Sequence, residues 1–223
     1  MNIIGRIYTD LPEKFGIPRQ SGLVPELMGK IIFEPKYRDE NALKGIEGFS
    51  HLWIIWQFSH NLREKWTPMV RPPRLGGDQK MGVFATRSPF RPNPIGLSCV
   101  KLEKIIKGNA GPELIVSGID MADGTPVFDI KPYLPLADCH PEATGGFAED
   151  HADYGLKVCI EAKQFPMFND RQRKALEGIL RNDPRPSYQH DEQRIYGLIF
   201  AGYNVRFKVK NGTVEITDCQ PKK

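Results

Sequence analysis

The sequence lacks the glycine-rich loops on which many nucleotide-dependent enzymes and hydrolases are built. No G-x-G-x-x-G follows a strand-like segment, no phosphate-binding Gly-Lys-Ser/Thr is present, and no G-x-S-x-G nucleophile elbow occurs. Gly76-Gly77 is followed by Asp78, an arrangement typical of a turn rather than of a phosphate cradle. These absences leave a Rossmann-type cofactor site and a serine-hydrolase site without support.

Cysteine is scarce, and long apolar runs are missing. No C-x-x-C pair occurs, and the five histidines have no metal-ligand spacing, so we expect no metal site. Isolated cysteines are typical of a reducing compartment, where they act as small buried apolar residues. The N-terminal segment MNIIGRIYTD has no apolar run long enough for a signal peptide or a membrane span. We therefore expect a cytoplasmic protein without membrane contact. The four cysteines are Cys99, Cys139, Cys159 and Cys219.

The overall composition indicates a folded, mildly basic protein. The chain has 223 residues, of which 40% are hydrophobic and 26% charged, so one large domain or one domain with a smaller partner can form a core. The formal net charge of +4 permits contact with nucleic acid or with an anionic small molecule, but surface lysine alone would produce the same value.

Most periodic segments in the first two thirds of the chain read as strands. Residues 51–58 are nearly all apolar, which predicts a strand buried on both faces, and residues 40–47 predict a short helix before Gly48. Short strands between Gly/Pro turns are typical of an all-β sandwich or barrel. The predicted strands are residues 2–8, 51–58, 80–86, 97–106, 113–119 and 126–131.

The pattern changes after residue 135. Residues 137–155 are rich in small, acidic and turn residues, which predicts a linker or long loop. Asn169 and Gln172 resemble a capping box, and the helix it begins should end at 182–188. Alternating strands at 205–210 and 213–217 flank Asn211-Gly212, a strong hairpin signal. The chain therefore ends in a small α+β module, whose helix should bury Ala175, Leu176, Ile179 and Leu180.

Three segments pair arginine with proline or glycine: PRQSG (18–22), RPPRLGG (71–77) and RSPFRPNPIG (87–96). Rigid loops lose little entropy on binding, and the guanidinium group suits carboxylates and phosphates. A single loop of this kind is readily explained as a surface turn with solvated arginines. Three within a hundred residues leave a shared anion-binding site as an equal alternative.

The segment DGTPVFDIKPYLP (123–135) begins with a turn, and on a strand Asp129 and Lys131 would share a face. A surface ion pair explains them at least as well as a cleft. His60 follows the strand at 51–58 and is interpreted as structural rather than catalytic. Trp53, Trp56 and Phe58 have apolar neighbours, which favours core packing over base stacking.

Several of these stretches together resemble the TsaA-like family of tRNA threonylcarbamoyladenosine N-methyltransferases. They occur in one order over nearly the whole chain, and the proline-rich loop is far more specific than a lone glycine motif. They are KFGIPRQSGLV (14–24), GFSHLWIIWQF (48–58), VRPPRLGG (70–77), GVFATRSPFRPNPIGLS (82–98), DGTPVFDIKPYLP (123–135) and DPRPSY (183–188).

The resemblance implies a mainly β protein with an N-terminal β-barrel at residues 1–140 and the small α+β module at 156–223. It implies a homodimer that binds S-adenosylmethionine and methylates the adenine amino nitrogen of threonylcarbamoyl-adenosine, beside the anticodon of a tRNA. It places the cofactor at Pro18, Arg19, Gln20, His60, Asn61, Arg87, Leu97, Asp123, Gly124, Thr125 and Pro126.

The chemistry of such a transfer suggests further roles. The accepting nitrogen is conjugated and weakly nucleophilic, so a base would help, with Asp129 or His60 as candidates and Lys131 as a group that steadies negative charge. Anticodon-loop phosphates call for cations, available at Arg71, Arg74, Arg91 and Lys131. A nucleotide- or RNA-binding module without catalysis, and a methyltransferase for another adenosine-type substrate, remain alternatives.

Overall fold

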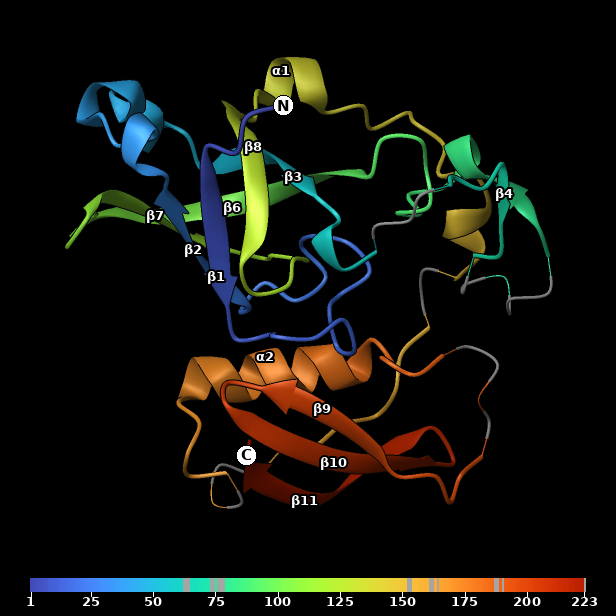
Figure 1. Ribbon diagram of the computed structural model, residues 1–223. Coiled ribbons are helices and arrows are strands. Elements are labelled where there is room, and N and C mark those ends of the chain that lie inside the picture. Colours follow the sequence, from blue (N-terminus) through green and yellow to red (C-terminus); the bar gives the residue numbers. More distant parts are fainter. Residues whose placement is uncertain are drawn as a thin grey trace.

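The computed structural model describes residues 1–61, 65–72, 75, 79–151, 154–160, 163, 165–186, 189 and 191–222. Six antiparallel strands close into a barrel in the order β1-β2-β7-β6-β3-β8. The expectation of an N-terminal β-barrel is thus confirmed (Figure 1). The strands are β1 (Gly5–Thr9), β2 (Met28–Phe33), β3 (His51–Gln57), β6 (Ile95–Gly108), β7 (Gly111–Ser117) and β8 (Thr125–Pro132).

The barrel interior is filled by every second side chain. In β3, Leu52, Ile54 and Trp56 are buried, whereas the alternate residues are only half-buried. The prediction that residues 51–58 are buried on both faces is therefore wrong, because the outer face of a closed single-sheet barrel has no second layer over it. Trp53 lies on that outer face, while Trp56 is core and Phe58 packs against the core.

Strand β2 is a barrel strand that pattern reading does not predict. Its buried positions are Gly29, Ile31 and Phe33, so the inward face starts with a residue that has no side chain. A Cβ at Gly29 would lie 2.6 Å from Ile7 Cδ1, which shows that the side chain of Ile7 fills this space. The inward position of β2 that lacks a side chain is therefore filled by a side chain of the neighbouring strand β1.

The connections are short 3₁₀ helices and one protruding hairpin. Instead of one helix at 40–47 there are two 3₁₀ turns, η2 (Glu40–Leu43) and η3 (Ile46–Gly48). The predicted strand at 80–86 is also wrong in most of its length: the hairpin pairs β4 (Met69–Val70) with β5 (Met81–Gly82), and η6 (Val83–Ala85) follows at once. The remaining short helices are η1 (Pro35–Tyr37), η4 (Ser59–Asn61), α1 (Pro135–Asp138) and η7 (Gly146–His151).

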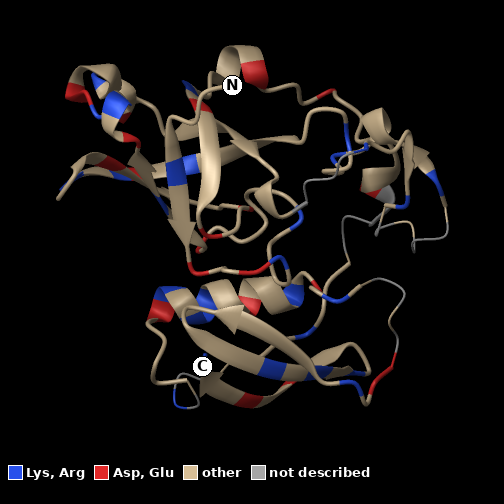
Figure 2. Ribbon diagram, viewed as in Figure 1, with Lys and Arg blue, Asp and Glu red and all other residues tan. Residues whose placement is uncertain are grey.

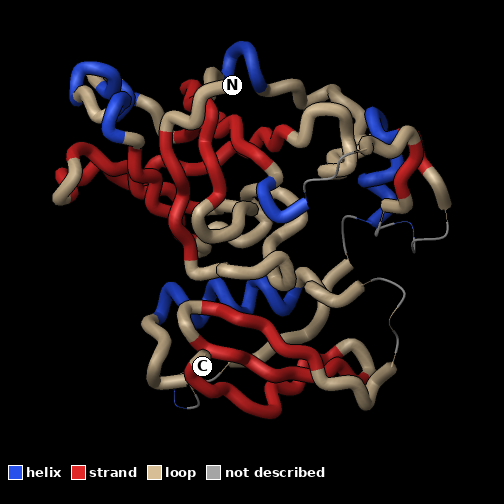
Figure 3. The backbone as a smooth tube through the Cα atoms, in the orientation of Figure 1, coloured by secondary structure: helices blue, strands red, loops and turns tan. Residues whose placement is uncertain are grey.

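The C-terminal module consists of helix α2 (Asp170–Arg181) and a sheet of β9 (Tyr196–Phe200), β10 (Tyr203–Lys210) and β11 (Thr213–Pro221). The capping box of Asn169 and Gln172 is confirmed in both directions. The Asn211-Gly212 hairpin is confirmed as well, with both residues at positive φ. The helix buries the four predicted residues, and Figure 3 shows how strands dominate both modules.

The two modules share one hydrophobic core. Phe15, on the loop after β1, packs against both Tyr196 and Phe207 of the C-terminal sheet at ring-centroid distances of 6.3 Å. Val24 of the same loop packs under α2 at Gly178. Helix α2 therefore lies between the barrel and the three-stranded sheet (Figure 1). The loop spanning residues 10–27 is held from both sides, which matters because it includes Pro18, Arg19 and Gln20.

Candidate site at the arginine loops

The loop between η6 and β6 is held in shape by its own side chains. Thr86 Oγ1 donates to the carbonyl oxygen of Val83 at 2.9 Å and accepts from the amide of Ser88 at 3.2 Å. Ser88 Oγ accepts from the amide of Phe90 at 3.2 Å. Arg91 Nη1 donates back to the carbonyl oxygen of Thr86 at 3.3 Å. These bonds and three prolines preorganise the loop, so Arg87 is presented on a rigid base.

Two of the three arginine-proline segments meet directly. Arg87 Nη1 donates a hydrogen bond to Gln20 Oε1, although the two residues lie 67 positions apart. Arg87 is exposed and Gln20 is half-buried. The third segment is only partly placed: Arg71 is exposed, and Arg74 lies outside the described residues. The Arg87–Gln20 contact thus supports a shared site for two of the loops.

A carboxyl group that pattern reading does not single out lies beside this contact. Trp56 Nε1 donates to Ser98 Oγ at 2.8 Å, and Ser98 Oγ donates to Asp120 Oδ1 at 2.6 Å. Burial raises the pKa of Asp120 to about 6, even though Ser98, the backbone amides of Asp120 and Ser21, and the charge of Arg87 all favour its ionised form. A lone acidic residue in the run VSGIDMA was the available sequence signal.

The turn at 123–126 is fixed to strand β1. Asp123 Oδ1 accepts from the amide of Thr9 at 2.8 Å, and the carbonyl oxygen of Gly124 accepts from Arg6 Nη1 at 3.0 Å. Thr125 and Pro126 are buried and pair with β1. Their side chains therefore belong to the core, and what this turn offers a ligand is the exposed Asp123 and backbone.

Leu97 and Asp129 lie in one row across the outer face of the barrel. Both are paired with Ile55 of β3, Leu97 from β6 and Asp129 from β8. Leu97 is 54% exposed. Asp129 Oδ2 lies 3.3 Å from Lys131 Nζ with both side chains about half exposed or more, so the predicted surface ion pair is confirmed. His60 is exposed in η4, and Asn61 ends that helix.

Arg19 is tied to the C-terminal module through the DPRP motif. Its Nη2 donates to the carbonyl oxygen of Asp183 at 3.3 Å. Asp183 is 5% exposed and accepts from Arg185 Nε at 2.8 Å, Arg185 Nη2 at 2.9 Å and Tyr154 Oη at 2.5 Å. Although burial alone would raise it, the pKa of Asp183 stays below its ordinary value because of these hydrogen bonds and the Arg185 charge. The motif therefore braces the loop that carries Arg19.

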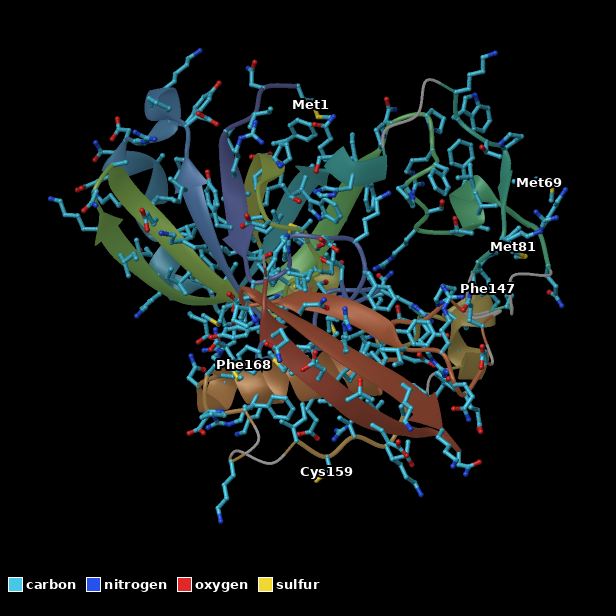
Figure 4. All side chains as sticks on the ribbon, turned by 60° about the horizontal axis from the view of Figure 1, so that its bottom comes forward. Met1, Met69, Met81, Phe147, Cys159 and Phe168 are labelled. Atoms are coloured by element: carbon cyan, nitrogen blue, oxygen red, sulfur yellow. The ribbon has the colours of Figure 1, made fainter. Side chains whose placement is uncertain are left out.

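The β4–β5 hairpin carries an exposed aromatic pair. Trp66 and Phe84 stack with ring centroids 6.2 Å apart and planes inclined by 21°, and their side chains are 49% and 72% exposed. Met69 and Met81 mark this arm in Figure 4. Figure 2 shows basic residues on both modules, interleaved with acidic ones.

The described residues also answer the questions about cysteines, metal ligands and membrane-spanning helices. The four cysteines are all free, and Cys139 and Cys159 are exposed, so the expectation that cysteines are buried apolar residues is wrong for these two. No group of three or more potential metal ligands occurs within the described part of the chain. None of the helices there is long and apolar enough to cross a membrane.

Comparison with known proteins gives consistent matches over both modules. A family model described as the tRNA-methyltransferase O N-terminal domain matches residues 6–139, and one described as the TrmO C-terminal domain matches residues 157–222. The tRNA (adenine(37)-N6)-methyltransferase of Escherichia coli (strain K12) is 39% identical, covering 98% of this chain and 97% of the relative. The protein of the same name from Eikenella corrodens is 46% identical over 74% of this chain and 93% of the relative. A crystal structure of TrmO from Pseudomonas aeruginosa is 33% identical with a TM-score of 0.75, covering 97% of this chain and 96% of that one.

Proposed function

Because the chain belongs to the tRNA-methyltransferase O family, we propose that it transfers a methyl group from S-adenosylmethionine to the amino nitrogen of adenine 37 in tRNA. We propose further that the adenine carries a threonylcarbamoyl group, so that the product is the N-methylated threonylcarbamoyl-adenosine. The observation that carries the proposal is similarity over the full length of a tRNA (adenine(37)-N6)-methyltransferase, including both modules.

The donor set around Arg87 suits S-adenosylmethionine. This cofactor carries an amino-acid end, an adenine and a cationic sulfonium, and when bound it supplies an electrophilic methyl group. Arg87 is exposed and is held by Gln20, so its remaining N–H groups can bind the cofactor carboxylate. Arg19 lies on the same loop as Gln20, and the exposed Asp123 can border the adenine. Pro18 is buried and shapes the loop.

The Asp129–Lys131 pair is our candidate for handling the accepting nitrogen. The nitrogen is conjugated to the purine and to the carbamoyl group, so removing its proton raises its reactivity. Asp129 lies in the same cross-strand row as Leu97 and can accept a proton at a carboxylate oxygen, while Lys131 can stabilise negative charge on the substrate. His60, exposed at the end of the β3 segment, is the other candidate base. Alignment of the two substrates contributes the rest.

The exposed pair of Trp66 and Phe84 suits the RNA partner. Splayed bases of an RNA loop stack on aromatic side chains, and such stacking tolerates different sequences. Arg71 lies next to β4 on the same arm and is exposed. Arg91 is half-buried and bonded within its own loop, which leaves its other N–H groups for a phosphate. We expect binding of tRNA to weaken with rising salt concentration, because phosphate contacts release counterions.

We also propose that the protein is a cytoplasmic homodimer. Leu97 on β6 and Leu134 and Leu136 at α1 are exposed apolar side chains, which a second copy would cover. Light scattering of the protein and of Leu136→Glu tests this. A dimer mass for the parent is expected. A monomer at micromolar concentration would contradict the proposal.

Transfer of labelled methyl groups tests the function itself. Protein, methyl-labelled S-adenosylmethionine and bulk tRNA are incubated, and label in tRNA is counted. Incorporation is expected with tRNA that carries threonylcarbamoyl-adenosine and not with tRNA that lacks it. Label in both tRNAs would indicate a methyltransferase for another adenosine. No label, with cofactor binding retained, would indicate a binding module without catalysis.

A further inference from the structure

We propose that Asp120 and Arg87 form the two halves of a zwitterion site, in which Asp120 binds the α-ammonium group of the methionine end of S-adenosylmethionine while Arg87 binds its carboxylate. This inference rests on the proposed function, because it assigns an additional residue to the cofactor site. Asp120 is not among the residues that the family resemblance places at the cofactor.

Asp120 is positioned at the junction of the two arginine loops. It follows the end of β7, where Gly118 turns the chain with φ of +73° and its carbonyl oxygen accepts from the amide of Gly22 at 2.8 Å. The amide of Ser21 also bonds to the Asp120 carboxylate. Asp120 therefore lies against the residue that follows Gln20, and Gln20 holds Arg87.

The opposite charges of Asp120 and Arg87 are near each other without being joined. The charge of Arg87 acts on the Asp120 carboxylate, but among the described residues no lysine or arginine nitrogen lies within ion-pair distance of Asp120. Arg87 donates to Gln20 instead. In a free α-amino acid group the ammonium and the carboxylate are attached to one carbon. Such a group carries the two charges needed to complement Asp120 and Arg87 together.

Two buried carboxylates have a cation in contact, whereas Asp120, which is half-buried, has none among the described residues. Glu113 is 7% exposed and lies 3.4 Å from Lys30 Nζ, and Asp183 is bonded to Arg185. Removing a carboxylate from water is costly unless a cation compensates. Among the described residues, the compensation at Asp120 is limited to neutral donors and a cation beyond ion-pair distance. An ammonium group on a ligand would complete it.

The alternative is that Asp120 only supports the fold by accepting from Ser98 and Ser21. Both roles predict that its loss weakens the cofactor site, so the test must separate charge recognition from support. Asp120→Asn is suitable because its amide oxygen can still accept from Ser98 Oγ. Glu103→Gln is the matched control, because Glu103 lies outside the proposed site and its Oε1 likewise accepts from a serine hydroxyl, Ser117 Oγ, at 2.6 Å.

Calorimetric titration with two ligands provides the test. S-adenosylhomocysteine carries the amino-acid end, and 5′-methylthioadenosine lacks it. For Asp120→Asn we expect the dissociation constant of S-adenosylhomocysteine to rise roughly 10- to 100-fold, as for loss of a hydrogen bond to a charged group, with that of methylthioadenosine changed less than twofold. Equal losses for both ligands, or no loss for either, would overturn the inference. Failure of the parent protein to bind S-adenosylhomocysteine would contradict the proposed function instead.

A pH titration of the unmodified protein keeps the inference testable if the variant does not fold. Asp120 is faced by Ser98 from β6, by the Ser21 amide and by the charge of Arg87. Below about pH 6 the carboxyl group is protonated, so affinity for S-adenosylhomocysteine should fall towards tenfold per pH unit while that of methylthioadenosine stays level. Parallel pH profiles for the two ligands would exclude the ammonium contact.

Discussion

Asp120 and Asp183 are two shielded acidic residues beside the loop carrying Arg19 and Gln20: the Ser21 amide favours the Asp120 carboxylate, and the backbone carbonyl oxygen of Asp183 accepts from Arg19. Asp183 accepts from both Arg185 and Tyr154, and its pKa is held low. Asp120 has no cation in contact among the described residues, and burial raises its pKa to about 6. The Asp183 carboxylate has its hydrogen-bond partners within the fold, and the residue holds the loop in place. The Asp120 carboxylate has no cationic partner among the described residues, which is the property expected of a group that binds a cationic ligand.

The largest loss of stability is expected on substitution of Asp183. Asp183→Ala leaves Arg185 buried without its partner and places alanine at φ of +47°, so we expect the free energy of unfolding to fall by about 3–5 kcal/mol. Urea denaturation measures this. Tyr154→Phe removes only one hydrogen bond and should cost about 1 kcal/mol. A similar small cost for both variants would show that the DPRP motif does not brace the loop.

Substitution of Asp120 should change the free energy of unfolding in the opposite direction. The folded protein retains the Asp120 proton up to about pH 6, whereas the unfolded chain releases it near the ordinary value of 3.8, so this group lowers stability as pH rises through that window. Asp120→Asn removes the titration. We therefore expect the variant to be more stable than the parent above pH 6, by at most about 3 kcal/mol, and the difference to vanish near pH 4. Denaturation curves at pH 4, 6 and 8 test this, and a variant that is less stable at every pH would mean that Asp120 acts mainly as a structural acceptor.

Arg87 should affect binding without affecting stability. It is exposed and bonds to Gln20 at the surface, so Arg87→Ala should weaken binding of S-adenosylhomocysteine by roughly 1–3 kcal/mol and leave the melting temperature unchanged. Arg71→Ala, an exposed arginine on the hairpin arm, is the matched control and should bind the cofactor normally. Unchanged affinity in Arg87→Ala would place Arg87 outside the cofactor site.

The smallest effect is expected on the hairpin arm. Trp66→Ala and Phe84→Ala each remove a stacking surface, so we expect the affinity for tRNA to fall by about 1 kcal/mol in each, within the range for base–aromatic stacking. Cofactor affinity should not change. Filter binding of tRNA at fixed salt measures the loss, with Ile195→Ala as a control that removes a similarly exposed apolar side chain from the C-terminal module. Equal losses in the control would assign the effect to general surface hydrophobicity.

Local patterns predict the parts of the fold that depend on local interactions. The capping box at Asn169 and the Asn211-Gly212 turn are short-range signals, and both are present. The pattern of alternation does not reveal strand β2, because its inward face begins with Gly29. The space beside this glycine is filled by Ile7 of the neighbouring strand. Strand β9 was missed too, and it contains Gly197 next to Asn204.

The site depends on contacts between distant residues, which a pattern cannot specify. Arg87 and Gln20 lie 67 positions apart, and only family resemblance places them at one cofactor. Asp120 meets Ser98 across 22 positions and has no motif of its own. Its significance follows from its surroundings: it is largely shielded from water, it accepts from Ser98 and the Ser21 amide, and the charge of Arg87 acts on it.

Mass spectrometry of tRNA nucleosides tests directly whether the protein methylates threonylcarbamoyl-adenosine. Bulk tRNA containing threonylcarbamoyl-adenosine is incubated with the protein and S-adenosylmethionine, digested and compared with an Arg87→Ala reaction. We predict that threonylcarbamoyl-adenosine decreases while a species heavier by one methyl group, with the methyl on the adenine amino nitrogen, appears with the parent protein and is strongly reduced with the variant. An unchanged nucleoside profile under conditions in which the cofactor binds would contradict the account.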